Sequence, residues 1–356
     1  MKVLQIGADR SKRGILVPGS AAYLRQKAYA VELGTLEIIG FSLRSDGFFM
    51  REDRCLRTLP TNSRSKLFFG LDAIRIARRL PRTEVISVQD PFETGLVAWW
   101  IARMWKVPLH VQIHTDFLSP EYAQHSITNR IRVFLAGFIL RRASRIRVVS
   151  ERIKASLVRT YTGLPEITVL PIFAEFKAAE TPDPKLVTRF EPFEKVVLVV
   201  ARLEPEKDVE LAIKVFAAAS PENSCLVIVG DGSQREYLEK LARTCAARDR
   251  IFFEGQQEAS LYYPLADVVM VTSRYEGYGL VIVEPLARGI PVISTDVGVA
   301  REAGAIVGHR DELDFTLNNW FKNGPTEGKL IMYPYKDFND YVAAYCADIM
   351  ACAVTR

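Results

Sequence analysis

The residues best suited to chemistry in this sequence are two glutamates, Glu276 and Glu284, that flank two glycines, Gly277 and Gly279. The stretch follows an apolar run at 268–271 and leads into a short helix predicted from residue 280 to Arg288. The glycines let backbone N–H groups approach a ligand closely, and a helix start at the carboxyl end of a strand favours an anion. A carboxylate can accept two hydrogen bonds from a vicinal diol. The pattern therefore predicts a site for a ligand with an anionic group and a diol, rather than a plain strand–turn–helix with a capping glutamate.

A second group of chemically capable residues is cationic. Arg202 ends an apolar run, and Lys207 stands just before a helix predicted over 209–219. A cation at a helix start opposes the helix dipole, and a bound diphosphate would remove that conflict. The alternative, in which Glu204 and Glu206 neutralise both cations on a surface loop, stays open at this point.

Two further candidates come from the first half of the chain. His114 follows an apolar run at 109–113 and is placed to contact a sugar or an acceptor, although a lone histidine is more often structural. Gly19 precedes Ser20, a predicted N-cap for a helix over 21–31, and its backbone can lie close to a ligand.

Several motifs are absent from the sequence. It contains no D-x-D triplet and no H-E-x-x-H, so we expect no metal held by the protein. It contains no G-x-x-x-x-G-K-[ST] loop and no G-x-G-x-x-G after the first apolar run, so nucleoside-triphosphatase and dinucleotide-binding classes lose support.

The elements that must position these residues alternate between short apolar runs and amphipathic stretches. Many of the runs are rich in Val and Ile without alternation, as is typical of strands buried on both faces of a parallel sheet. This strand–helix–strand order predicts an α/β fold with doubly wound sheets. Strands are expected at 3–6, 36–41, 85–89, 109–113, 146–149, 168–170, 196–201, 226–229, 251–253, 268–271 and 292–294.

The order is interrupted once, over residues 175–194, which are rich in proline and charge. This segment predicts a linker between a Rossmann-like domain at 1–174 and a second one at 195–335. Two such domains would face each other across a cleft at the carboxyl ends of their sheets, where ligands of such sheets bind. An aromatic and apolar tail predicts a final helix over about 336–356.

Charge is divided unequally along the chain. Residues 1–176 hold 27 Lys and Arg against 15 Asp and Glu, net +12, whereas the rest holds 20 against 27, net −7. A basic first half predicts an anionic partner for that half.

The basic half also carries apolar residues near its arginines, which predicts an anionic membrane surface as a partner. The alternative is that the apolar faces are core and the arginines are solvated. The sequence shows no long apolar run and no signal peptide, so we expect a cytoplasmic protein that lies peripherally on the membrane. The residues concerned are Trp99, Trp100, Trp105, Phe134, Leu135, Phe138, Ile139, Arg141, Arg142, Arg145, Arg147 and Arg152.

Taken together, these motifs resemble those of the GT-B glycosyltransferases, specifically the retaining family 4 group. The resemblance is carried by the E-x7-E pattern Glu276…Glu284 with its inner G-Y-G-L, and by Arg202 with Glu206-Lys207-Asp208. It is also carried by Val229-Gly230-Asp231-Gly232 and by the run from Gly289 to Thr295.

The resemblance implies a hexosyltransferase that moves a sugar from a UDP- or GDP-sugar to a glycan or lipid-linked acceptor, such as a cell-envelope polysaccharide. It also implies retention, no metal, no cofactor, no nucleic-acid partner, and a final helix that crosses back to the first domain. The resemblance implies that Glu284 binds the ribose and that Arg202 and Lys207 bind the diphosphate. It implies that His114 contacts the transferred sugar and that the base lies near Gly255 and Gln256. The donor sugar would be bound by Glu276 and by the backbone of Gly277, Tyr278, Gly279 and Leu280.

The chain departs from the family pattern on the acceptor side. Gly19-Ser20 stands where the family has two glycines, and Pro171-Ile172-Phe173 stands where it has Pro-Asn-Gly. Alternatives that remain open are a GT-B-like sugar epimerase or phosphorylase, a two-lobed sugar-binding protein without activity, and a degenerate transferase serving as a partner subunit.

Overall fold

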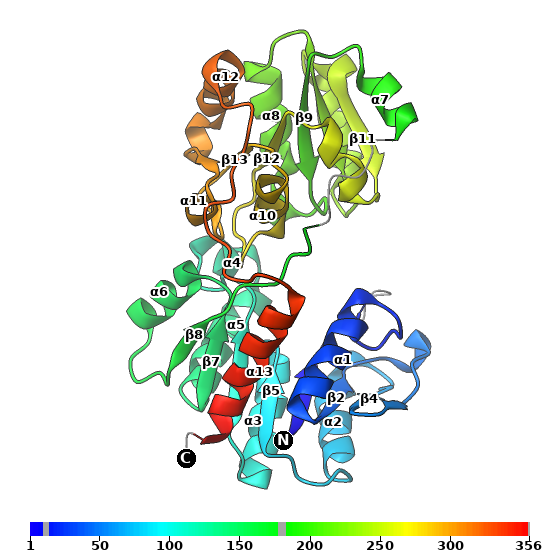
Figure 1. Cartoon of the computed structure of the whole chain (residues 1–356), viewed down its shortest axis with the longest axis vertical. Helices are drawn as coiled ribbons and strands as arrows, with labels where there is room; N and C mark the ends of the chain where they lie inside the picture. The colour runs from blue at the N-terminus through cyan, green and yellow to red at the C-terminus, as the bar shows by residue number, and fades with distance from the viewer. Residues whose placement is uncertain (10–13, 177–182, 355–356) are drawn as a thin grey trace. The chain divides into compact units, whose positions relative to one another are not determined.

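The computed structural model describes residues 1–9, 14–176 and 183–354, which form two compact units. The first unit joins Met1–Phe173 to Tyr335–Arg356, and the second is Ala174–Pro334. In each unit a mainly parallel sheet is covered by helices (Figure 1). The prediction of an α/β fold with two Rossmann-like units is confirmed.

The described residues of the first unit contain an eight-stranded sheet in the order β3-β4-β2-β1-β5-β6-β7-β8. All neighbours are parallel except β3 and β4, a short antiparallel pair that the apolar pattern did not predict. Its strands are β1 (Lys2–Gly7), β2 (Thr35–Gly40), β3 (Arg51–Asp53), β4 (Leu56–Pro60), β5 (Val85–Val88), β6 (Leu109–Ile113), β7 (Arg145–Val148) and β8 (Ile167–Val169). Its helices are α1 (Ala21–Leu33), α2 (Phe69–Ala77), α3 (Glu93–Trp105), α4 (Pro120–His125), α5 (Ile127–Leu140), α6 (Glu151–Thr160) and α13 (Phe338–Val354).

The described residues of the second unit contain a six-stranded parallel sheet in the order β11-β10-β9-β12-β13-β14. Its core is built from strand residues such as Val197, Ile228 and Met270 packed against Phe216 of α8. Its strands are β9 (Lys195–Val200), β10 (Ser224–Val229), β11 (Ile251–Gly255), β12 (Val268–Val271), β13 (Val292–Ser294) and β14 (Ile306–Val307). Its helices are α7 (Pro184–Phe190), α8 (Val209–Ala219), α9 (Arg235–Thr244), α10 (Leu280–Ala287), α11 (Ala300–Ala303) and α12 (Leu313–Asn323), with short 3-10 turns η3 (Pro205–Lys207) and η7 (Arg310–Glu312).

The segment predicted as a linker over 175–194 is revised by the structure. Residues 177–182 lie outside the described residues, but helix α7 belongs to the second unit. Phe190 of α7 packs edge-on against Phe252 of β11, with ring centroids 5.4 Å apart, and Arg189 pairs with Glu254 at 2.9 Å. Proline and charge there mark a helix start and its exposed face, because Pro184 occupies the first turn and Asp183 caps it.

The final helix, α13, packs on α1, β5 and β6 of the first unit, as expected (Figure 1). Its aromatic residues meet α1: Tyr345 stacks on Tyr29 with ring centroids 4.1 Å apart, and Tyr29 donates to the Tyr341 hydroxyl at 2.7 Å. The aromatic content of the tail is therefore explained by core packing.

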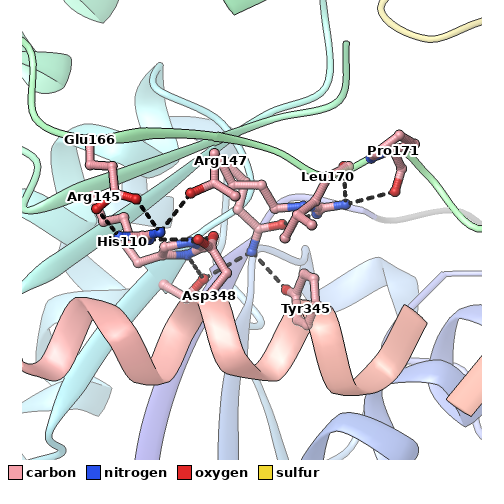
Figure 2. A network of polar contacts seen from close by, with 11 residues as sticks. His110, Arg145, Arg147, Glu166, Leu170, Pro171, Tyr345 and Asp348 are labelled. Atoms are coloured by element: carbon pink, nitrogen blue, oxygen red, sulfur yellow. Dashed lines mark hydrogen bonds and ion pairs between the residues drawn. The ribbon is translucent and has the colours of Figure 1, made fainter. Parts of the chain in front are cut away.

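A buried polar network fastens α13 to the sheet (Figure 2). Asp348 of α13 lies 2.9 Å from His110 Nε2 and accepts from Arg145 Nε at 2.6 Å. Arg145 also pairs with Glu166, at 2.5 Å. Although burial opposes it, the hydrogen bonds and charge of His110 and Arg145 hold the pKa of Asp348 at about 2.

The same network buries Arg147, whose guanidinium donates to Gln112 Oε1 at 2.8 Å and to the Leu170 carbonyl at 3.0 Å. The guanidinium carbon lies 4.9 Å from the ring centroid of Tyr345. The prediction that Arg145 and Arg147 belong to a basic membrane-facing cluster is therefore wrong, because both side chains bind α13 and the sheet. Trp105, also predicted there, is buried in the core.

Candidate active site

A cavity of about 310 Å³ lies in the second unit, lined by the carboxyl-end residues of β9, β10 and β12 and the loops that follow them. Four of the predicted site residues line it: Arg202, Lys207, Gln256 and Glu276. The carboxyl edge of a parallel sheet is where such folds bind ligands, so the cavity is the candidate active site.

Lys207 and Glu276 face each other in this cavity. Lys207 Nζ lies 2.5 Å from Glu276 Oε1, and the Ser273 hydroxyl donates to the same oxygen at 2.8 Å. Both charged side chains are largely shielded from solvent, with exposed fractions of 17% and 12%. The cation is thus held by a single carboxylate that an incoming anion can replace or share.

Arg202 is the more exposed cation of the pair. Its guanidinium lies 3.0 Å from Glu206 Oε1, while Glu204 is occupied by Ser233, whose hydroxyl donates to it at 2.6 Å. The alternative in which Glu204 and Glu206 neutralise both cations therefore holds for Arg202 only. Lys207 is paired with Glu276, which the sequence places 69 residues away.

Backbone crowding shapes the base of the cavity. A Cβ at Gly230 would lie 1.8 Å from the Ala201 carbonyl oxygen, so only glycine lets β9 and β10 end side by side there. The Gly230 N–H donates to the Gly255 carbonyl at 2.7 Å, which ties down the segment that presents Gln256. Gly255 itself has φ +71° and does not line the cavity.

Glu284 lies on α10, whose cavity-lining residue is Val281. The Tyr263 hydroxyl donates to Glu284 Oε2 at 3.1 Å, and the Arg288 guanidinium lies 5.0 Å from the Tyr263 ring centroid. Burial raises the pKa of Glu284, against the opposing influence of Tyr263 and Arg288. Glu284 is thus a fixed hydrogen-bond acceptor next to the cavity rather than part of its wall.

The loop between β12 and α10 has the form that the glycine pattern predicts. Gly279 caps α10 with φ +98°, a conformation that favours glycine. Tyr278 is buried, and its carbonyl accepts from the Val299 N–H at 2.9 Å. Gly277, Tyr278, Gly279 and Leu280 do not line the cavity. Their backbone sets the start of α10 beside it.

His114 and Gly19 lie in the first unit. His114 follows β6, and burial, with the nearby charges of Arg147 and Arg25, lowers its pKa to about 3. It is therefore a neutral imidazole at pH 7. Gly19 has φ +78° and precedes the N-cap Ser20, whose hydroxyl accepts from the Tyr23 N–H at 3.0 Å. Their roles as ligand contacts stay predictions.

Some residues that shape this site were given no role from the sequence. Thr272 and Ser273 line the cavity, Tyr263 holds Glu284, and Asp208 anchors the turn after Lys207. Hydroxyl and carboxylate side chains of this kind are common on surfaces, and only the folded chain brings them together.

Within 1–9, 14–176 and 183–354, no cluster of three or more His, Cys, Asp or Glu side chains has the arrangement needed to hold a metal ion. Across the same residues, no helix has the length and apolar character of a membrane span.

Both units match known protein families. Residues 18–172 match the family described as "Glycosyl transferase 4-like domain", and residues 187–309 match "Glycosyl transferases group 1". The chain is similar to an alpha-D-kanosaminyltransferase of Streptomyces kanamyceticus, with 31% identity over 273 residues that cover 68% of this chain and 70% of that relative. It is also similar to an alpha-monoglucosyldiacylglycerol synthase of Streptococcus pneumoniae, with 29% identity over 242 residues, 62% of this chain and 54% of the relative. The chain thus spans about half the length of the latter.

The fold is shared with solved structures. HepE of Anabaena, crystallised with UDP and glucose, superimposes with a TM-score of 0.68 at 19% identity, over 100% of this chain and 97% of that one. The motif pattern around Glu276 and Glu284 agrees with these findings: two family matches, one in each unit, a relative at 31% identity, and a shared fold. The chain belongs to the GT-B glycosyltransferases of the family 4 type.

Proposed function

We propose that this protein transfers a hexosyl group from a nucleoside-diphosphate sugar to a glycan or lipid-linked acceptor. The observation that carries the proposal is Lys207 Nζ, held by one carboxylate in a cavity at the carboxyl edge of the second sheet. The crystal structure of HepE with UDP and glucose supports UDP as the nucleotide, and a GDP-sugar is the other donor to be tested.

The cations of the cavity suit the chemistry of the leaving group. When the bond between the sugar C1 and the diphosphate oxygen breaks, negative charge grows on the diphosphate, and Arg202 and Lys207, which both line the cavity, would stabilise it. The acceptor oxygen forms the new bond to C1, and its proton passes to the departing phosphate. With two cations already in place, we propose that the reaction needs no metal and no cofactor, and that it retains the anomeric configuration, as the family resemblance implies.

A donor-hydrolysis screen with UDP- and GDP-sugars, run with and without EDTA, tests this proposal. Replacing Arg202 or Lys207 with Ala should lower turnover roughly a hundredfold, the scale of losing one transition-state donor. Lys214→Ala is the matched control, because Lys214 is an exposed lysine on α8 that pairs with the neighbouring Glu210 at i,i+4 spacing and does not line the cavity. Full turnover in both cavity variants would refute the diphosphate site, and loss of activity in EDTA that magnesium restores would refute the metal-free account.

For the acceptor, we propose a lipid-linked or anionic molecule that the first unit meets at an anionic membrane surface, on the cytoplasmic face. Helix α5 exposes Ile127, Ile131 and Phe134, at positions i, i+4 and i+7, with exposed fractions of 76%, 62% and 82%. Arg141 and Arg142 at its end are also exposed. An apolar helix face beside cations suits a membrane interface, and the relative named alpha-monoglucosyldiacylglycerol synthase supports a lipid acceptor.

A further inference from the structure

Asp208 follows Lys207 directly and adopts an unusual backbone conformation. It lies between η3 and α8 with φ +49° and ψ +47°, the left-handed region, and only 5% of it is exposed. Residues other than glycine adopt this conformation at a cost, and the surrounding structure must hold them there. The contacts that hold Asp208 therefore indicate the function of this turn.

The carboxylate of Asp208 ties together three separate segments. Its Oδ2 lies 3.3 Å from Nε of Arg274, in the loop that carries Glu276, and it also pairs with Arg310 of η7. One buried carboxylate thus joins the turn after Lys207 to the opposite wall of the cavity and to the segment after β14.

The backbone of the same turn is fastened from β12. The Thr272 hydroxyl lies 3.1 Å from the Lys207 carbonyl and 3.0 Å from the Asp208 carbonyl, and the Arg274 N–H donates to the Glu206 carbonyl at 2.8 Å. Lys207 is therefore held at its backbone as well as at its tip. A lysine side chain is flexible, so a fixed backbone decides how often its ammonium lies in the cavity.

We propose that Asp208 is a positioning residue that holds Lys207 in place for the diphosphate of the donor. This inference rests on the proposed function and deepens it. Asp208 acts through Lys207, since its own carboxylate is occupied by two arginines and does not line the cavity.

A purely electrostatic role for Asp208 predicts the opposite sign. Replacing Asp208 with Asn removes one negative charge between Arg274 and Arg310, so the region becomes more positive. If Asp208 acted only as a nearby charge, a diphosphate would then bind more tightly. If Asp208 positions Lys207, the diphosphate binds more weakly, because the ammonium is no longer fixed.

The test is calorimetry on the whole chain with UDP and with uridine, which lacks the diphosphate. Asp208→Asn should weaken UDP binding roughly tenfold, within the range for directly interacting residues, and leave uridine binding unchanged. Arg310→Gln, which keeps Asp208, should show a smaller loss of the same kind. The matched control is Asp267→Asn, because Asp267 pairs with Lys195 and the Val196 N–H, both at 2.8 Å, at the amino edge of the sheet. Asp267→Asn should lower the stability of the protein without a loss of affinity that is specific to UDP.

A double variant decides whether Asp208 acts through Lys207. In a Lys207→Ala background, Asp208→Asn should cause no further loss of UDP affinity. Asp208→Gly, which suits the backbone but removes the carboxylate, should still bind UDP more weakly than the native chain. The inference is overturned if Asp208→Asn binds UDP more tightly, or if it loses as much affinity for uridine as for UDP. It is also overturned if the losses in the double variant are additive, or if Asp208→Gly binds UDP with native affinity. If Lys207→Ala alone leaves UDP affinity unchanged, the proposed diphosphate site is refuted. That result can be told apart from the four outcomes above, which refute only the role of Asp208.

Discussion

At the scale of single residues, both cations of the candidate site are paired with carboxylates of the same chain. Lys207 pairs with Glu276, so this shielded cation is not left uncompensated, and the more exposed Arg202 pairs with Glu206. Under the proposed function, binding of the diphosphate would exchange one anion for another. Such an exchange would cost less than desolvating a free cation, and it would leave the ammonium close to the place where charge develops in the proposed reaction.

Glu284 provides a test at the residue scale. If its carboxylate, oriented by Tyr263, binds the ribose diol, Glu284→Gln should weaken binding of UDP by about tenfold, since hydrogen bonds to charged groups contribute about 1.5–3 kcal/mol. The same change should affect a 2′,3′-dideoxy analogue much less, because that analogue has no diol. Calorimetry with both ligands measures the difference. Equal losses for the two would show that Glu284 serves only to hold Tyr263 and α10.

At the scale of elements, α13 is the helix that completes the first unit. Its Asp348 binds His110 (Figure 2), and His110 Nδ1 lies 3.0 Å from the Ser87 hydroxyl, so each polar group of the imidazole has a partner. Because the ionised carboxylate of Asp348 can only accept, Nε2 of the neutral His110 carries the hydrogen, and Nδ1 accepts from the Ser87 hydroxyl. Despite the resemblance to a Ser-His-Asp relay, Ser87 and His110 are fully buried, so the network holds a helix and does not meet a substrate.

This network makes the stability of the first unit depend on pH. Burial lowers the pKa of His110 in the folded chain, so below pH 6.5, the ordinary value, the unfolded chain binds a proton that the folded chain does not. The free energy of unfolding should therefore fall as pH drops below about 6.5. It should fall again between about pH 4 and pH 2, because the unfolded chain there binds a proton at Asp348 that the folded chain, with an Asp348 pKa of about 2, does not.

Thermal melts followed by circular dichroism from pH 7.5 to 4.5 measure this dependence. His110→Asn should reduce the slope of the melting midpoint with pH, whatever its effect on the midpoint at pH 7. The matched control is His125→Asn, an exposed histidine at the end of α4, which should keep the native slope. A native slope in His110→Asn would show that other groups, His114 among them, account for the whole effect.

At the scale of the whole molecule, a chain with net charge +5 carries a basic first half and an acidic second half. The structure changes which residues can act at a membrane: Arg147 and Trp105 are buried and Arg145 is paired with Asp348, whereas Arg141, Arg142 and the α5 face are exposed. Trp100 is also exposed, at 49%. The surface that we propose meets lipid is thus smaller and more apolar than the sequence suggested.

Liposome flotation tests membrane binding. The protein should float with anionic vesicles, less so as salt is added because surface charges are screened, and not with neutral vesicles. Ile131→Ser with Phe134→Ser should weaken flotation at least tenfold, since burying each large apolar side chain contributes about 1.5–3 kcal/mol. Phe315→Ser is the matched control, since Phe315 is 66% exposed on α12 of the second unit. If the native protein does not float with anionic vesicles at low salt, the acceptor is soluble and the basic surface is merely solvated.

The sequence by itself determined the elements and their class. Buried parallel strands read as continuous apolar runs, so β1, β9 and β10 could be located to within one or two residues. The short strands β3, β4 and β14 were not predicted, because two to five residues with charged or interrupted composition do not form a recognisable apolar pattern. Local glycine and helix-start signals also located the loop from Ser273 to Leu280, since backbone conformation there depends on neighbours in sequence.

Only the tertiary structure decided which side chains meet. Lys207 pairs with Glu276, and not with the glutamates beside it, because parallel strands bring the ends of β9 and β12 together. Arg145 and Arg147 look like a solvated basic run, but their side chains contact Asp348 and Tyr345 of α13, which come from the far end of the chain. Contacts of this kind join residues separated by tens to hundreds of positions. No local pattern encodes them, because they arise from the order of strands in a sheet and from which helix covers it.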